Sequence, residues 1–158
     1  HASEWYEWAW IKRPLLDAYT SLKSGKISVV STFGNPVIWW SAIPALFYTI
    51  YLWQIRQDKI AGYLCISYAS MLFPWLFIHR TVFIYQYFAC SMIQILMLGN
   101  CLHFFWERDP KRTRKAALLY LAAVIGAFLL FYPVLSGYPV KQEFAEQWLE
   151  WLEGWVLS

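Results

Sequence analysis

The sequence predicts an all-α, polytopic membrane protein with four transmembrane helices and an amphipathic interfacial segment on either side of them. Of 158 residues, 59% are hydrophobic and 21% aromatic, while only 15% carry charge. Soluble domains hold about half apolar and about a quarter charged residues, so this chain departs towards a lipid environment. Four long apolar runs approach the roughly 20 helical residues that cross a bilayer. The net charge of +3 is too small and too scattered to indicate nucleic acid as a partner.

Residues 1–35 form an outside-facing segment and loop in this prediction. Trp5 and Trp8 are three residues apart and would share one face of a helix within residues 3–19. This pattern favours an anchor that lies in the membrane interface, and the alternative is that the segment helps to cover an active site. Residues 21–32 are polar and contain glycine, so an outside loop is expected there.

Asn35 and Pro36 predict the start of the first transmembrane helix, which runs to about residue 54 without a charge. Asn is a good N-cap and Pro fits the first helical turn. Trp39 and Trp40 follow at once and are expected at the membrane interface, where they would fix the depth of the helix. Because helix N-termini attract phosphate, Asn35 is also a candidate binding residue, although capping is the simpler role.

Three further apolar runs complete a four-helix bundle over residues 36–135, at about 60–78, 82–106 and 116–135. Helices satisfy their own backbone hydrogen bonds, which lipid cannot do. Gly99, Gly126 and the pair Ala122–Ala123 are expected to let neighbouring helices approach closely. The three cysteines are an odd number within apolar stretches, so no disulfide framework or metal site is indicated.

The loops between the spans predict the orientation of the bundle. The sequences "RQDK" (56–59) and "ERDPKRTRK" (107–115) carry most of the basic residues and lie on one side of an even-numbered bundle. The positive-inside rule places that side in the cytoplasm. Residues 1–35, the turn 79–81 and residues 136–158 are then on the non-cytoplasmic side.

Residues 136–158 are predicted to be an outside-facing amphipathic tail. An apolar stripe at helical spacing would consist of Phe144, Trp148, Trp151, Leu152 and Trp155. Glu143, Glu146, Glu150 and Glu153 would form the opposite, solvated stripe. The acidic face favours contact with water over contact with anionic lipid, so a structural role is expected.

Arg80 is the candidate for chemistry that the residues single out, in a short turn between two spans. Its planar guanidinium can donate two parallel hydrogen bonds to a phosphate, and His79, Tyr85 and Tyr87 lie close by in the sequence. The alternative is that Arg80 extends to a lipid phosphate and only marks the helix end. His103 is expected to be a packing or interface residue near the cytoplasmic end.

Other ionisable residues predict little chemistry of their own. Lys12, Arg13 and Asp17 could form surface pairs with Glu4 and Glu7, each worth less than about 1 kcal/mol. The sequence shows no nucleophile triad, glycine-rich phosphate loop or cluster of metal ligands. We therefore expect no cofactor and no metal, and a chain that supplies only part of a site.

Four stretches, in order along the whole chain, resemble the C-terminal four-transmembrane region of the protein O-mannosyltransferase family. They are "HASEWYEWAWIKRPLLDAY" (1–19), "GNPVIWW" (34–40), "PWLFIHRTVFIYQYF" (74–88) and "FYPVLSGYPV" (131–140). The resemblance implies a glycosyltransferase that moves mannose from a polyprenyl or dolichyl phosphate carrier to Ser or Thr of a secreted protein, on the non-cytoplasmic face. It implies no firm need for a metal.

The resemblance also implies how the site is divided. This portion would mainly bind the lipid carrier, with Arg80 on the phosphate and with His79, Tyr85, Tyr87 and Asn35 nearby. The family's catalytic Asp-Glu pair lies in an upstream outside loop and has no counterpart here. The chain is thus expected to need the upstream N-terminal membrane region of the same enzyme as a partner and to be inactive alone.

Two departures from the family pattern keep alternatives open. Ala9 stands where relatives have proline, and Gln86 stands where histidine is common. The alternatives are transfer of a different carrier-linked sugar and a non-catalytic membrane module that associates with a partner transferase. The start at His1, without a Met, suggests a piece of a longer protein. The short stretch 20–35, without an inserted domain, favours a bacterial plasma membrane over an endoplasmic reticulum.

Overall fold

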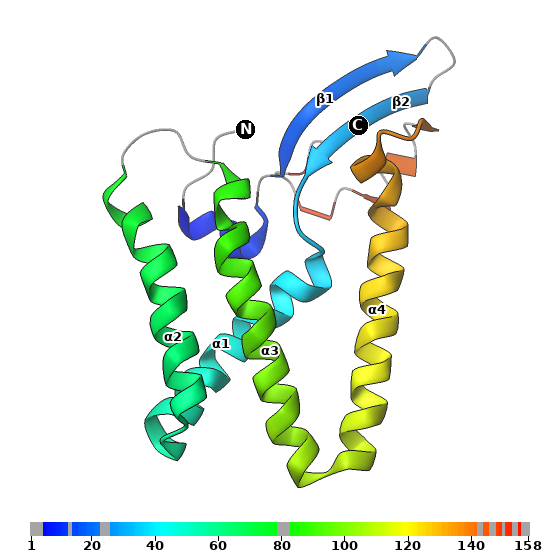
Figure 1. The fold of residues 1–158 in the computed structure, drawn as a ribbon. Coiled ribbons are helices and arrows are strands. Elements are labelled where there is room, and N and C mark those ends of the chain that lie inside the picture. The colour runs from blue at the N-terminus through cyan, green and yellow to red at the C-terminus, as the bar shows by residue number, and fades with distance from the viewer. Residues whose placement is uncertain are drawn as a thin grey trace.

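Four long helices dominate the computed structural model, which describes residues 5–12, 14–22, 26–78, 83–141, 144–145, 148–149, 151–152 and 155 (Figure 1). The helices are α1 (Pro36–Arg56), α2 (Lys59–Leu72), α3 (Phe88–Arg108) and α4 (Pro110–Ser136). Short 3-10 helices continue α2 (η2, Phe73–Phe77) and lead into α3 (η3, Ile84–Tyr87). Four helical segments are long and apolar enough to cross a membrane, which confirms the predicted mostly helical class.

Side-chain caps fix where three of these helices begin. The Asn35 side chain accepts hydrogen bonds from the backbone N–H of Val37 at 3.0 Å and of Ile38 at 3.5 Å. Asp58 caps α2 in the same way, and Asp109 accepts from the backbone N–H of Arg112 at the start of α4. Such caps satisfy backbone donors that have no partner within the helix. The predicted capping role of Asn35 is confirmed.

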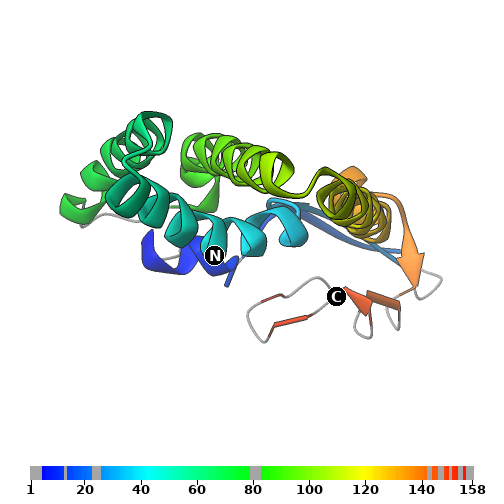
Figure 2. The same ribbon diagram turned by 90° about the horizontal axis from the view of Figure 1, so that it is seen from below.

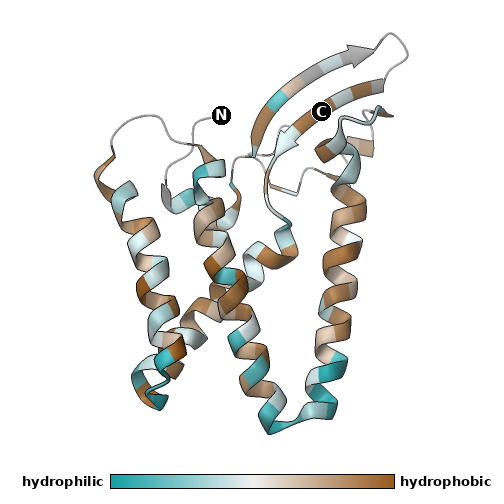
Figure 3. Cartoon of the chain, viewed as in Figure 1, coloured by the Kyte–Doolittle hydropathy of each residue, from teal (hydrophilic) through white to brown (hydrophobic). Residues whose placement is uncertain are grey.

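The helices form a shallow bundle in which α1 lies across the others. Figure 2 shows α2, α3 and α4 side by side in one row with α1 across them, and α4 stands apart from α2. Hydropathy follows the same axis, because the turns α1–α2 and α3–α4 are hydrophilic while the middle of each helix is mostly apolar (Figure 3). We call the end with these two turns the basic end, and the opposite end, where α1 and α3 begin, the aromatic end.

The segment before α1 differs from the helix and loop that were predicted. A 3-10 helix η1 (Trp5–Trp10) is followed by an antiparallel hairpin of β1 (Leu15–Leu22) and β2 (Lys26–Thr32), and β3 (Val140–Lys141) pairs with β2 as a third strand. Ile27, Val29 and Ser31 alternate with more exposed residues along β2. This period of two, rich in β-branched residues, is typical of a strand with one buried face.

Aromatic packing joins the two flanks of the chain at the aromatic end. Trp155 is 1% exposed, and its indole N–H donates to the backbone oxygen of Ile11 at 2.6 Å. Its ring lies 5.3 Å from that of Phe33 and 5.5 Å from that of Phe131, measured between centroids. The segment before α1 and the tail after α4 therefore pack against each other over the bundle.

The tail only partly follows the predicted apolar stripe. Ala145, Leu149 and Trp155 are buried, whereas the other predicted members of the stripe are more than a third exposed: Phe144, Trp148, Trp151 and Leu152. The four glutamates of the opposite stripe lie outside the described residues. Of the five residues assigned to the stripe, Trp155 alone is buried by the rest of the chain.

Gly99 and Gly126 do not bring helices of the described chain together, contrary to the prediction for these neighbours. A Cβ atom at either position would meet open space within 4 Å. The close approach occurs instead at Gly62, where a Cβ would lie 2.8 Å from the indole nitrogen of Trp53. Gly62 thus allows α2 to lie against a large side chain of α1.

Candidate functional site

A small cavity at the aromatic end lies between the first turns of α1 and α3. Its volume is about 130 Å³, and its lining combines apolar groups with polar side chains: Gly34, Asn35, Ile38, Trp39, Ala42, Phe88, Ser91, Gln94 and Ile95. On α3, Phe88, Ser91 and Gln94 follow at intervals of three residues and so face α1 together.

Two polar atoms of this lining are buried without a partner. Trp39 is 3% exposed and Gln94 is 2% exposed, and neither the Trp39 indole nitrogen nor Gln94 Oε1 has a hydrogen-bond partner among the described residues. An unsatisfied buried polar atom costs about 1–3 kcal/mol, and buried polar groups are normally paired. The cavity therefore suits an occupant that accepts from an N–H and donates to an amide oxygen, as a hydroxyl group or water can.

A group of packed aromatic rings holds the Trp39 side chain in place. The Trp39 ring stacks on Tyr87, with 5.6 Å between centroids and 10° between planes. The Tyr87 hydroxyl lies 2.8 Å from that of Tyr68 on α2, so both are hydrogen-bonded to each other. Trp8 of η1 covers this group, with its ring 5.7 Å from Trp75 and 6.2 Å from Tyr87. The segment η1 thus packs against the aromatic group that holds Trp39.

Gly34 is required by the position of Trp39. A Cβ atom on Gly34 would fall inside the Trp39 ring, so only glycine leaves room for the indole. Trp40 points elsewhere and donates to the backbone oxygen of Trp10 at 3.1 Å. Within the chain, the Trp39 side chain is buried and that of Trp40 is half-buried. The predicted depth of both residues at the membrane interface stays a prediction.

The predicted site residues divide into three groups. Asn35 lines the cavity, but both ends of its side-chain amide are engaged, since Nδ2 donates to the backbone oxygen of Val124 on α4 at 2.9 Å. Tyr87 is buried behind Trp39, and Tyr85 is 48% exposed beside Phe83. Arg80 and His79 lie outside the described residues. Phosphate contacts by these five residues stay predictions.

Gln86 has a structural role just before α3. Its Oε1 accepts from the backbone N–H of Phe83 at 3.1 Å, at the start of η3. Sequence reasoning missed Ser91 and Gln94. The signal was present, because a serine and a glutamine lie three residues apart on one face of an otherwise apolar helix.

None of the other ionisable residues that the structure describes lines the cavity. Lys12 pairs with Glu7 at 2.7 Å, as predicted, but only the Lys12 side chain is on the surface, with exposures of 57% for Lys12 and 9% for Glu7. Thr32 donates to Asp17 across the hairpin. His103 was predicted to be a packing or interface residue. It does not pack within the described chain, since its side chain is 69% exposed and its Nε2 lies 3.4 Å from Glu107 Oε1. Glu4 and Arg13 lie outside the described residues, which contain no group of three or more potential metal ligands.

Comparison with known proteins finds one family. A sequence model described as the C-terminal four TMM region of protein-O-mannosyltransferase matches residues 1–155. A polyprenol-phosphate-mannose–protein mannosyltransferase of Mycobacterium tuberculosis is 30% identical over 132 residues, which cover 77% of this chain and 24% of the relative. The enzyme of the same name from Corynebacterium glutamicum is 25% identical over 173 residues, which cover 98% of this chain and 33% of the relative.

A solved structure shares the fold. The Saccharomyces cerevisiae protein O-mannosyltransferase Pmt1–Pmt2 complex, bound to the sugar donor, matches with a TM-score of 0.74 and 20% identity over 98% of this chain and 23% of that chain. The chain thus spans a quarter to a third of the bacterial relatives described above, with 24% and 33% of their lengths.

Proposed function

Because the chain belongs to the protein O-mannosyltransferase family, as its C-terminal four-transmembrane region, we propose that it forms the carrier-binding membrane portion of a complete mannosyltransferase. The enzyme would move mannose from a polyprenyl or dolichyl phosphate to Ser or Thr of secreted proteins. The names of the relatives state a polyprenol-phosphate-mannose or dolichyl-phosphate-mannose donor and a protein acceptor. The observation that carries the proposal is the cavity with two buried, unpaired polar atoms at the aromatic end.

The proposed division of labour follows from chemistry. In the transfer, the bond from the sugar C1 to the phosphate oxygen breaks and a bond from C1 to the Ser or Thr oxygen forms. The acceptor proton goes to a carboxylate from the upstream region, and the phosphate leaves with its charge. Arg80, with His79 and Tyr85 nearby in sequence, would stabilise that charge, because a guanidinium makes paired, charge-assisted hydrogen bonds to phosphate.

Residues that line the described cavity would hold the carrier so that its phosphate lies near Arg80. Trp39 and Gln94 offer a free N–H and a free oxygen to a hydroxyl of the bound donor or to a bridging water. Tyr87 would act indirectly, because its ring holds Trp39 while its hydroxyl is bonded to Tyr68. Asn35 would fix the N-terminal end of α1 against α4 through its hydrogen bond to the backbone oxygen of Val124.

The rest of the enzyme would pack on the exposed side of α4. Ala122, Ala123 and Gly126 are exposed and small, and Leu118 and Leu121 beside them are more than half exposed. Small residues let transmembrane helices approach closely. In this proposal the aromatic end faces the non-cytoplasmic side and the basic end the cytoplasm of a bacterial plasma membrane, as the loop charges and the bacterial relatives favour.

Mannose transfer by the full-length enzyme tests the proposal. Arg80→Ala should lower the rate of transfer from polyprenyl-phosphate-mannose to an acceptor peptide about 100-fold or more, as loss of a charge-stabilising donor does. Arg80→Lys should recover only part of the rate, because an ammonium lacks the planar fork. Gln94→Leu should lower transfer while membrane abundance, measured by immunoblot, is unchanged. Arg114→Ala, at the other end of the bundle, is the matched control.

Unchanged transfer by Arg80→Ala and Gln94→Leu would contradict the proposal. The glycan on the labelled acceptor identifies the sugar, and a hexose other than mannose would favour the alternative of a different carrier-linked donor. Activity only after addition of a separate, larger transferase would favour the non-catalytic module.

A further inference from the structure

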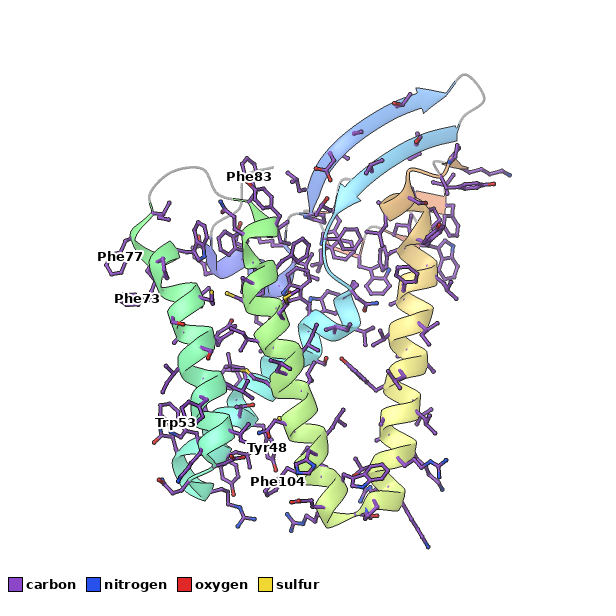
Figure 4. All side chains as sticks on the ribbon, in the orientation of Figure 1. Tyr48, Trp53, Phe73, Phe77, Phe83 and Phe104 are labelled. Atoms are coloured by element: carbon purple, nitrogen blue, oxygen red, sulfur yellow. The ribbon has the colours of Figure 1, made fainter. Side chains whose placement is uncertain are left out.

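The basic end of the bundle contains two clefts, one on each side of the end of α3. The larger, about 570 Å³, lies between α3 and α4. Its polar lining is Arg108, Asp109, Arg112 and Thr113, and its apolar lining is Leu102, Phe105 and Ala116. The smaller, about 390 Å³, lies towards α1 and shares Arg108 with the first. Figure 4 shows Tyr48 of α1 and Phe104 of α3, which line the smaller cleft, near the turns of this end.

The arginines of these clefts have no carboxylate partner among the described residues. Of the nearby acids, Asp109 caps α4 through the backbone N–H of Arg112, and Glu107 lies beside His103. Neither is in a salt bridge with Arg56, Arg108 or Arg112. Arg56 lies over the Phe104 ring at 5.5 Å. The two turns together hold seven basic and three acidic residues, so positive charge is left uncompensated.

We propose that the larger cleft binds the headgroup of an anionic phospholipid, with its phosphate between Arg108 and Arg112. Guanidinium groups bind phosphate through paired hydrogen bonds, and basic pockets between transmembrane helices bind anionic headgroups at membrane surfaces. The apolar wall of Leu102, Phe105 and Ala116 offers a surface for the first carbons of an acyl chain. A soluble phosphate would use the guanidinium groups alone.

This site is separate from the proposed carrier site. Helix α3 has 21 residues and so spans roughly 30 Å between the two ends of the bundle. The inference holds whether or not the aromatic end binds a sugar carrier, because it uses none of the same residues. Its occupant is a lipid of the leaflet at the basic end, bound without chemical change.

The distribution of charge supplies a matched control. Arg114 and Lys115 are exposed bases of the same helix turn but do not line the cleft. A general attraction between basic loops and an anionic surface would depend on both pairs equally. Binding at a specific site in the cleft would depend on Arg108 and Arg112 and not on Arg114 and Lys115.

Native mass spectrometry of the full-length enzyme tests this. The enzyme would be incubated in detergent with equal amounts of phosphatidylglycerol and phosphatidylcholine, and the bound lipid counted. We expect retention of phosphatidylglycerol, about tenfold less retention in Arg108→Gln/Arg112→Gln, and retention within about twofold of wild type in Arg114→Gln/Lys115→Gln. Arg108→Lys/Arg112→Lys should recover part of it, since charge is kept and the fork is lost.

Three results would overturn the proposal. One is equal retention of the two lipids, and another is equal loss in both glutamine double variants. The third is complete displacement of phosphatidylglycerol by millimolar inorganic phosphate, which would make the cleft a site for soluble phosphate. Thermal unfolding of each variant in detergent shows whether a loss of bound lipid reflects a loss of folding. Lipid retention by the Arg108→Lys/Arg112→Lys variant gives the same test in a chain that keeps its charge.

Discussion

The two ends of the bundle use aromatic residues in opposite ways. At the aromatic end, Trp39 and Tyr87 are stacked and are 3% and 1% exposed. At the basic end, Tyr48 and Phe105 are stacked just as closely, with 5.0 Å between centroids, yet Phe105 is 44% exposed. Ring stacking alone therefore does not make a core. The first end is closed by the chain's own flanks, while the second is left open to whatever surrounds it.

The difference lies in what covers the rings. Trp8, Phe33 and Trp155 come from outside the four helices and bury the aromatic end. The basic end has only the tight turns α1–α2 and α3–α4, whose aspartates cap helices and whose arginines line clefts. Substitutions at the first end should therefore change folding, and substitutions at the second should change folding little.

Trp155→Ala should have the largest effect. The substitution removes a fully buried ring and its hydrogen bond to Ile11, and loss of a buried Trp costs about 3–5 kcal/mol. Thermal unfolding of the full-length enzyme in detergent measures this. Trp148→Ala is the control, because Trp148 is 57% exposed. Equal unfolding temperatures for the two variants would show that the tail does not stabilise the aromatic end.

Gly34→Ala should have the next largest effect. The added methyl group would occupy the Trp39 ring, so the ring must leave its stack on Tyr87, and overpacking of this kind costs about 1–3 kcal/mol. The unfolding temperature and the rate of mannose transfer should both fall. Gly99→Ala meets open space and should leave both unchanged or raise stability slightly, since alanine favours helices. A harmless Gly34→Ala would mean that Trp39 is not held where the structure has it.

His103→Ala, at the basic end, should have the smallest effect. The side chain is 69% exposed, and an exposed pair with Glu107 at helical spacing contributes at most about 0.5 kcal/mol. The unfolding temperature should stay within error of wild type at both low and high salt. A loss as large as that of Gly34→Ala would contradict the contrast between the two ends.

The sequence predicted what local rules determine. The four spans and the cap at Asn35 follow from apolar length and from the Asn-Pro pair. The cap is at the predicted residue, and each span lies within six residues of its predicted bounds. The motif resemblance predicted the family. These features depend on residues close together in the chain, which is why pattern reasoning reached them.

Features that depend on distant residues were missed. The hairpin was predicted to be a loop, although the buried Ile27 and Val29 alternate with more exposed residues. Its third strand comes more than 100 residues later, as the pairing of Lys26 with Lys141 shows. The burial of Trp39 was not predicted, because nothing in "GNPVIWW" indicates that Tyr87 will stack on its ring. The cavity could not be predicted for the same reason, because Gln94 lines it only together with residues of α1 that are distant in the sequence.

The third strand has a consequence for biosynthesis. Ribosomes deliver the N-terminal part of a chain first, so β1 and β2 exist before α1 enters the membrane. Their partner strand Val140–Lys141, and the Ser28 hydroxyl's acceptor at the Gly137 carbonyl, are made only after α4. Closing contacts so far apart in sequence comes late and slowly. Strand β3 can pair with β2 only when both lie on the same side of the bilayer. A completed sheet therefore marks a chain in which α4 has been inserted in the correct direction.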